Sequence, residues 1–524
     1  MKHYPFSIFV LAPFPGTNRF SDNVPLVGPL DIYDVDEGIR SLGCTIDIPL
    51  PKNVCPDGEI RVGIEKIADL KPQHVVRCSA FLTSLVEALE YVKAHRTEPE
   101  EMAEGLRKKF GHLPLDLSVL LPKPEPEADS SDALLDAIFA KVEVPAGQAS
   151  ATVLPLDAQL EDLLGTSLQY VYKDNDFRRL ESILRGIQML VRQGPVKKSA
   201  KTSVTLCNVD MDNLENGLRH IVRSSGERAP SLVLLDLPFD NSFASVDMLE
   251  TLANFSEALQ VPTVVHLSSA FFGKKDWSHF ASVGYLANEL ETQPYAKFRA
   301  LQGGAASRWL TIALPEVCVR NPYGTDDVRP IAFKEAEGIW LSPVWAVGTL
   351  AVKSQVAFGW PTRLTDVHAC QIGNMAIPTY AGRSTPLDAL FKEDRLNQLY
   401  DVGMAPLRGV AEREPIFLTR APTMTGESLG FQLLANRVVG FFYDQKNALS
   451  GHPEIEEPAA LVEILRARFI EKWEETGQPL PEDLVIGVAH TDSMGQVVLS
   501  IRMKPPRELV PEPKRLEFEI SFSI

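Results

Sequence analysis

The chain has 524 residues, a formal net charge of −17, 45% hydrophobic residues and 23% charged residues, which is the composition of an ordinary globular protein. The negative charge disfavours binding to nucleic acid or to an anionic membrane surface, because both require a basic face on the protein. Six dispersed cysteines without a CxxC pair, and the lack of a signal peptide or a long apolar run, predict a cytoplasmic protein without membrane insertion.

The first 115 residues predict a small α/β domain. Residues 6–14 (FSIFVLAPF) and 44–50 (CTIDIPL) are apolar runs typical of buried strands, and VDEGIRSL between them is typical of a helix. Residues 79–96 carry apolar side chains at helical spacing and end in basic residues, as a helix C-terminus favours. The segment EEMAEGLRKKF then continues as a charged helix, so we place this domain at residues 1–115.

A change of composition follows, and it predicts a linker. Residues 116–132 include LPKPEPEADSSD, whose prolines and acidic residues are typical of a stiff, solvated connection. The next ten residues, ALLDAIFAKV at 133–142, place apolar side chains at i, i+4 and i+8 with two more beside them. Such a helix either docks on a partner or packs on its own domain. The apolar positions are Leu134, Leu135, Ile138, Phe139 and Val142.

Residues 133–524 predict a larger domain. After strongly helical sequence at 155–192, strands and helices alternate in the order β-α-β-α-β to about residue 330, which indicates a mainly parallel, covered sheet. The run RWLTIALPEVCV adds a further strand. We expect residues 335–475 to be mainly helical and residues 480–524 to hold antiparallel terminal strands. The predicted fold class is therefore mixed α/β.

The last segment, LEFEISFSI, alternates between apolar and polar side chains. This period predicts a strand with one buried face and one polar face. A terminal strand of this kind either closes its own sheet or adds to the edge of a neighbour's sheet, which makes it a candidate inter-subunit strand. The apolar face comprises Leu516, Phe518, Ile520 and Phe522, with Ile524 at the end.

One short motif raises the alternative of a serine hydrolase. The sequence GESLG matches G-x-S-x-G with Ser428 at its centre, and His490 with Asp444 or Asp483 would complete the chain order Ser, Asp, His. A nucleophile elbow needs a buried strand before the serine, but RAPTMT is polar and contains proline. The competing interpretation is that Thr425 and Ser428 lie in a helix-capping turn.

The stretch LPEVCVRNPYG at 314–324 ends an apolar run with a charged residue and a turn. From the residues alone, Arg320 could be catalytic or could fix an assembly interface. The chain contains no GxxxxGK[ST], GxGxxG or HExxH motif, and its histidines show no ligand spacing. We therefore expect neither a cofactor nor a metal.

Five stretches resemble, in the right order, segments of the large contractile-sheath subunit of bacterial type VI secretion systems. They are FRRLESILRGIQMLV, PSLVLLDLPFDNSFASVDMLETLANFSEALQVPTVVHLSSAFFG, RWLTIALPEVCVRNPYG, SQVAFGWPTRL and PLDALFKEDRLNQLYDVGMAPLRG. The resemblance covers about residues 131–524. Arg178 and Leu184 are departures, since the family usually has glutamine and tryptophan there.

The N-terminal unit resembles the small sheath subunit of the same systems in its apolar opening strand, in the helix that follows, and in ADLKPQHVV. The chain as a whole is therefore similar to a fusion of the small and large sheath subunits. In that family the two are separate chains that pair tightly. The resemblance predicts that residues 1–115 and 131–524 pack through a hydrophobic interface, to which the helix at 79–96 contributes.

The resemblance implies a structural protein rather than an enzyme. Sheath subunits form a helical polymer around an inner tube, on a baseplate, and drive protein secretion when their packing switches; a AAA+ unfoldase grips a helix at the place that ALLDAIFAKV occupies here. Arg320 is then a salt-bridging or turn-fixing residue. The opening strand begins near Tyr4 and the chain ends at Ile524, so we expect less strand exchange between subunits than in the family. The alternative is a non-contractile scaffold or adaptor.

Overall fold

The computed structural model describes most of the chain. The described ranges are 6–16, 26–30, 35–95, 99–117, 155–194, 202–224, 230–324, 333–449, 457–491, 496–512 and 514–523. The predicted linker from residue 118 onward and the predicted helix at 133–142 lie outside these ranges.

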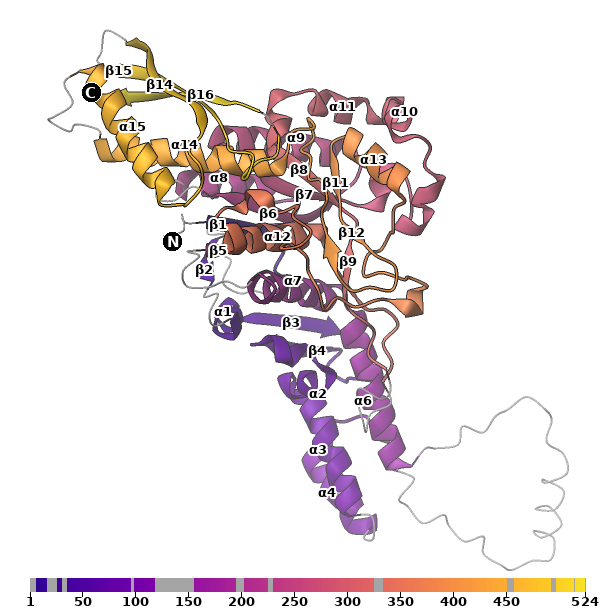
Figure 1. The fold of residues 1–524 in the computed structure, drawn as a ribbon. Coiled ribbons are helices and arrows are strands. Elements are labelled where there is room, and N and C mark those ends of the chain that lie inside the picture. Colours follow the sequence, from indigo (N-terminus) through magenta and orange to yellow (C-terminus); the bar gives the residue numbers. More distant parts are fainter. Residues whose placement is uncertain are drawn as a thin grey trace, which may run out of the picture.

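A seven-stranded sheet forms the centre of the molecule, with the strand order β11-β8-β7-β6-β1-β5-β2 (Figure 1). All neighbours are parallel except β2, which runs antiparallel to β5. The inner strands are nearly continuous apolar runs because both faces are covered. The strands are β1 (Phe6–Ala12), β2 (Leu26–Leu30), β5 (Thr202–Asn208), β6 (Leu232–Phe239), β7 (Thr263–Leu267), β8 (Leu310–Leu314) and β11 (Met404–Pro406).

Helices cover the two faces of this sheet. On one face lie α7 (Asn175–Arg192) and α12 (Pro343–Phe358), the latter apolar on nearly all sides because it is buried. On the other face lie α8 (Leu214–Ser224) and α9 (Phe243–Leu259). The helices α7 and α12 approach closely at Gly186, where an added Cβ would lie 2.4 Å from the ring of Trp345. The smaller α10 (Leu286–Leu290) and α11 (Ala296–Gln302) follow β7.

The N-terminal segment contributes a central strand to the sheet. The strand β1 pairs with β5 on one side and with β6 on the other. The chain then forms α1 (Val35–Leu42), the hairpin of β3 (Cys44–Pro49) and β4 (Glu59–Ile64), the short α2 (Pro72–Val75), α3 (Ala80–Ala94) and α4 (Pro99–Phe110). The strands β1 and β3 and the helices α1, α3 and α4 lie where the sequence predicts them, whereas β4 and α2 are additional. The sequence pattern does not indicate the position of β1 between two strands from much later in the chain.

An arm of helices extends from the body in Figure 1, where α3 packs along α6 (Leu156–Lys173). Leu85 and Leu89 of α3 share one apolar core with Leu160 and Leu164 of α6. Farther along α6, the hydroxyl of Tyr172 donates a buried hydrogen bond of 2.7 Å to the carbonyl oxygen of Leu70. The prediction that the two segments pack through a hydrophobic interface including the 79–96 helix is therefore confirmed.

The run RWLTIALPEVCV forms two strands instead of one. The chain leaves the sheet after β8 at Pro315, which has no N–H group to continue a ladder. The following β9 (Val317–Arg320) pairs instead with β10 (Ile339–Leu341) in a separate antiparallel ladder. This break places the end of β9 against α7, away from the edge of the sheet.

The stretch from 335 to 475 is helical at its two ends, in α12 and in α14 (Leu429–Leu449) with α15 (Pro458–Glu474). Its middle differs from the prediction. Between α12 and α14, among the described residues, the only α-helix is α13 (Glu393–Asp401), alongside β11 and the two-residue strands β12 (Arg408–Gly409) and β13 (Ile416–Phe417). Six prolines are spread over this part of the chain, and proline interrupts helices by removing a donor.

The C-terminal strands form their own antiparallel sheet, in the order β14-β15-β16, as predicted. They are β14 (Glu482–Thr491), β15 (Gln496–Lys504) and β16 (Leu516–Ser523). One face of this sheet packs on α14 and α15 around a separate apolar core. The predicted fold class, mixed α/β with a parallel sheet and antiparallel C-terminal strands, is confirmed. Over the ranges described above, no helix is both long and apolar enough to cross a membrane.

We expect residues 155–524 to be insoluble when produced alone, because β5 and β6 would lack the strand that joins them. Co-production with residues 1–117 should restore a soluble complex that co-purifies through a tag on either part. The same experiment with Val10→Asp in residues 1–117 is the control, because Val10 is fully buried in β1 and the variant should not rescue. A soluble, cooperatively unfolding 155–524 fragment would contradict the central role of β1.

Candidate functional site

The stretch LPEVCVRNPYG leads into a buried ion cluster centred on Arg320. Its guanidinium binds Glu181 through two contacts (Nε–Oε1, 2.8 Å; Nη2–Oε2, 3.1 Å) and Glu335 through two more (Nη1–Oε2, 2.5 Å; Nη2–Oε1, 3.0 Å). The exposed fractions of the three side chains are 9%, 0% and 3%. Planar guanidinium groups match carboxylates in this two-point geometry, which lysine cannot reproduce.

Two further arginines complete the ion cluster. Arg185 lies one turn along α7 from Glu181 and contacts it at 2.7 Å, and Arg178 contacts Glu335 at 3.2 Å. The ring of Tyr323 packs 4.1 Å from the guanidinium carbon of Arg320. The cluster therefore ties the end of β9 to α7 and to the segment before β10.

Burial by itself lowers the pKa of Arg320, but the hydrogen bonds and charges of Glu335 and Glu181 outweigh it and hold that pKa above its usual range. Arg320 therefore keeps its proton and remains charged. The side chain also donates to the carbonyl oxygen of Asn321 at 2.8 Å, which fixes the turn that follows β9. This geometry is that of a clamp between elements, with the guanidinium fully occupied by internal partners.

A second buried polar cluster lies at the carboxyl ends of β6, β7 and β8. Asp236 of β6 accepts a hydrogen bond from the indole of Trp345 (2.7 Å) and pairs with Arg179 of α7 (3.0 Å). His266 of β7 lies beside them, and its Nε2 is 4.0 Å from the carboxylate of Glu316, just after β8. Ligands of α/β proteins often bind at this edge of the sheet, but here α7 and α12 supply side chains that fill it.

Ser428 lies in a turn that begins α14. Its hydroxyl accepts a hydrogen bond of 3.1 Å from the backbone N–H of Phe431, which is a helix-capping contact. The residues before it form a turn and an isolated bridge, not a strand. Among the described residues, no hydrogen bond joins Ser428 to His490, Asp444 or Asp483, and Asp483 pairs with Arg515 at 2.9 Å.

The predicted apolar face of the last strand lies against the protein's own core. Leu516, Ile520 and Phe522 are buried, and Phe518 packs edge-to-face on Phe442 of α14, with ring centres 5.7 Å apart. The strand pairs with β15 from Leu516 to Ser523. Its other edge, like the outer edge of β14, has no strand beside it within the described ranges. The five apolar positions of the predicted docking helix lie outside those ranges.

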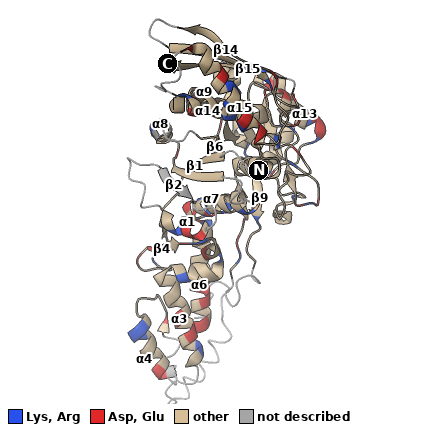
Figure 2. Cartoon of the chain, turned by 60° about the vertical axis from the view of Figure 1, so that its left-hand side comes forward, with Lys and Arg blue, Asp and Glu red and all other residues tan. Residues whose placement is uncertain are grey.

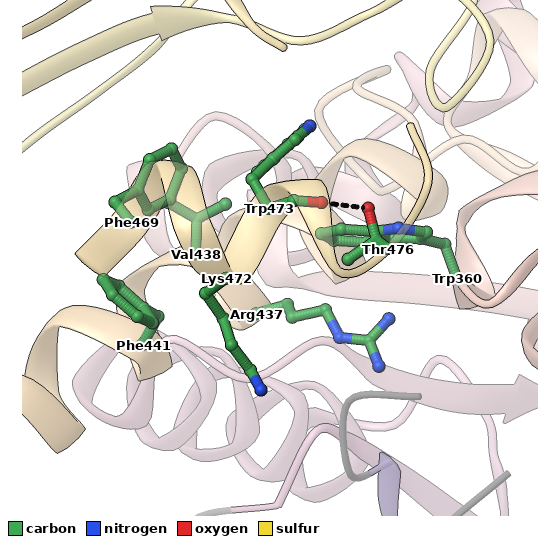
Figure 3. Close-up of a pocket in the computed structure, with 8 residues that line it drawn as sticks. All are labelled: Trp360, Arg437, Val438, Phe441, Phe469, Lys472, Trp473 and Thr476. Atoms are coloured by element: carbon green, nitrogen blue, oxygen red, sulfur yellow. Dashed lines mark hydrogen bonds between the residues drawn. The ribbon is translucent and has the colours of Figure 1, made fainter. Parts of the chain in front are cut away.

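An aromatic pocket lies between α14, α15 and Trp360 (Figure 3). Its cavity of about 20 Å³ has room for about one water molecule, which is too small for a cofactor or a substrate. The lining residues are Trp360, Arg437, Val438, Phe441, Phe469, Lys472, Trp473 and Thr476. In the part of the chain that the structure describes, no three His, Cys, Asp or Glu side chains gather as metal ligands would.

Residues 223–425 match the family described as "VipB: EvpB/VC_A0108, tail sheath N-terminal domain". The central part of the chain resembles a tail-sheath domain. The chain is also similar to the type VI secretion system sheath protein TssC1 of Pseudomonas aeruginosa, with 24% identity over 239 residues, or 40% of this chain and 48% of the relative. The chain thus spans about half the length of the curated relative that it matches. The sheath-domain match runs from the end of α8 to the turn before α14 and includes Arg320 and Glu335.

Sequence reasoning singled out Arg320 and missed both of its carboxylate partners. The spacing of Glu181 and Arg185 at i and i+4 on a predicted helix indicates an ion pair, but nothing in it points to a residue 139 positions away. Glu335 lies beyond the turn after β9, in sequence without a regular pattern. Arg178, noted only as a departure from the family, belongs to the cluster through Glu335.

We expect Arg320→Met to destabilise the protein by roughly 3–5 kcal/mol, because it leaves two buried carboxylates short of positive charge. Urea unfolding of the full chain measures this. The variant with Glu181→Gln and Glu335→Gln added should regain part of the loss, since the uncompensated charges are then gone. Arg502→Met is the matched control, because its pair with Glu517 is exposed on the C-terminal sheet and should change the unfolding free energy little. A loss no larger at Arg320 than at Arg502 would contradict the clamp.

Proposed function

We propose that this chain is a structural subunit of a contractile tubular sheath in a type VI secretion-like apparatus. The observation that carries the proposal is the sheath-domain match over residues 223–425, which includes Arg320 and Glu335 of the ion cluster. The similarity to a named type VI sheath protein supports the same assignment. A rigid, internally satisfied cluster suits a part that transmits force, because it holds its elements in one relative position.

We further propose that the chain fuses a small-subunit-like domain at 1–115 with a large-subunit-like domain at 133–524, through a linker at 116–132. Support comes from the shared sheet and from the apolar contact of α3 with α6, since both join the two segments as a subunit interface would. Covalent linkage raises the effective concentration of one half for the other. It also fixes their ratio at one to one.

In this proposal the partners are further copies of the chain, an inner tube protein and a baseplate, and the polymer works in the cytoplasm without a cofactor. The C-terminal sheet supports a role in self-assembly, because it stands at one end of the molecule in Figure 1 and has two strand edges free among the described residues. Free edges are templates for pairing with another chain. Figure 2 shows acidic as well as basic residues on α3, α4 and α6, which favours protein contacts over nucleic acid.

The hydrolase alternative has little support. Ser428 caps α14, and an elbow needs a strand directly before the nucleophile, where this chain has a turn. The matched family and the relative are both described as sheath proteins. A non-contractile scaffold or adaptor derived from a sheath subunit is the second candidate, and it would keep the same fold and the same ion cluster.

Negative-stain electron microscopy of the purified full chain tests the proposed function. Tubes support a sheath subunit, and addition of the inner tube protein should increase their number. Discrete particles under every assembly condition would support the adaptor instead. Esterase turnover that disappears in Ser428→Ala would support the hydrolase.

The edge of β16 provides a sharper test of assembly. Ser521→Lys with Ser523→Lys places two lysines on the polar face of this edge strand, where lysine opposes pairing with another chain. We expect the protomer to keep its unfolding midpoint and to lose tube formation, as sedimentation would show.

The matched control is Gln496→Lys with Ser500→Lys on β15, the central strand of the same sheet. Its residues pair with Ser523 and Glu519, so it adds the same charge to the same face away from the edge. This control should still assemble. Equal loss of tubes in both variants would show a general charge effect, and normal tubes in both would remove β16 from the interface.

We also propose that residues 133–142 dock a AAA+ unfoldase, on the basis of their position in the resembling family and their apolar spacing. Phe139→Asp should then abolish disassembly of contracted tubes without changing the unfolding midpoint. Ala140→Asp, which adds the same charge on the opposite side of a helix, should disassemble normally. A collapse of the unfolding midpoint in Phe139→Asp alone would show instead that the segment is part of the core.

A further inference from the structure

The second buried cluster contains more carboxylates than positive partners. Three acidic groups gather there, from β6 (Asp236), from the segment after β8 (Glu316) and from the segment before α13 (Asp388). Asp236 pairs with Arg179, and Asp388 pairs with Arg383 at 2.6 Å. Glu316 has no arginine or lysine within ion-pair distance in the described part of the chain, and the nearest basic group is His266.

His266 is a buried hydrogen-bonding group without a partner. Its side chain is 2% exposed, and among the described residues no donor or acceptor contacts its Nε2. Such an atom is costly to leave unpaired. Burial lowers the pKa of His266 to about 4, with Asp236 raising it and Arg179 lowering it further, so the ring is neutral at ordinary pH. A neutral imidazole carries one proton; in the tautomer with that proton on Nδ1, Nε2 is an acceptor, and the group it needs is a donor.

We propose that Glu316 is a proton-binding site, and that its protonated carboxyl group donates a hydrogen bond to Nε2 of His266. The proton comes from solvent, which reaches 37% of the Glu316 side chain. The two groups are 4.0 Å apart, so a small side-chain rotation closes the contact. Protonation satisfies the orphaned nitrogen and removes a negative charge from a site that already holds two carboxylates.

The surroundings of Glu316 raise the pKa of its carboxyl group towards neutral pH. Burial is the largest cause that raises the pKa of Glu316 to about 7. The negative charges of Asp388 and Asp236 raise this pKa further, and the positive charge of Arg179 lowers it. Two other charged groups act through Asp388, namely Arg383, which pairs with it, and Asp276, which raises its pKa. Solvent screens part of the penalty because Glu316 is not fully covered, so we expect a smaller effect on stability than complete burial would give.

Glu316 directly precedes the short strand β9, whose last residue is Arg320 of the ion cluster. The carbonyl oxygen of Glu316 accepts a hydrogen bond of 3.0 Å from the N–H of Asp388. The next contact, from Cys318 N–H to the carbonyl oxygen of Pro386, is 2.7 Å. The proton therefore binds beside one end of the connection whose other end Arg320 clamps.

The sign of the pH dependence follows from the raised pKa. Between the unfolded value near 4.5 and the folded value near 7, the native state holds more protons than the unfolded state, so stability falls as pH rises through this window. Urea unfolding of the full chain from about pH 5 to about pH 8.5 should show a roughly tenfold to hundredfold larger loss of the folding equilibrium constant in the wild type than in Glu316→Gln, as a shift of about one to two pKa units gives. The full shift from 4.5 to about 7 is the upper limit, because solvent screens the partly exposed side chain.

Glu474→Gln, exposed on α15, is the matched control and should keep the wild-type slope. Equal slopes in the wild type and Glu316→Gln would overturn the proposal. Infrared difference spectra of the unmodified protein give a second measurement that does not depend on folding of the variant. A protonated-carboxyl band that disappears with a midpoint near pH 7 supports the proton site, and its absence throughout this pH range contradicts it.

Discussion

The pairing of Arg320 with Glu181 and Glu335 is the interaction on which the rest of the described structure depends. It is made where the chain leaves the central sheet, and it joins β9, α7 and the segment before β10 at one point. Burying three such charges has a high desolvation free energy, and only near-complete pairing offsets it. Two-point contacts to both carboxylates, with Arg178 and Arg185 as further partners, meet that requirement. A lysine cannot make two-point contacts to both carboxylates, which explains an arginine at the end of an apolar run.

The helix α7 organises both buried polar clusters. Its neighbouring residues Arg178 and Arg179 point to different partners, one to Glu335 and the other to Asp236 on the sheet. Because the same helix packs on α12 at Gly186, its position along the sheet is fixed by apolar contact and by charge at once. The N-terminal segment then completes the core by inserting β1 between β5 and β6.

Local pattern was enough to predict the elements with strong periodicity. The strands β1, β3, β5 to β7 and β14 to β16 lie where apolar runs or alternation placed them, and α3, α6 and α7 follow helical spacing. Long-range pairing was not predictable, because neither the insertion of β1 nor the partners of Arg320 leave a trace in neighbouring residues. The sequence predicts one strand across Pro315, whereas the structure has two strands separated by this proline. In the region after α12, recurring prolines interrupt the helices that the sequence predicts.

The proposed sheath subunit has a rigid centre and exposed strand edges, and the structure of the assembled polymer tests this arrangement most directly. Helical reconstruction by cryo-electron microscopy should show the Arg320 cluster unchanged within each subunit and a strand of a neighbouring copy paired with the free edge of β16. Tubes whose subunits leave that edge unpaired, or a cluster opened so that Arg320 contacts another copy, would contradict it.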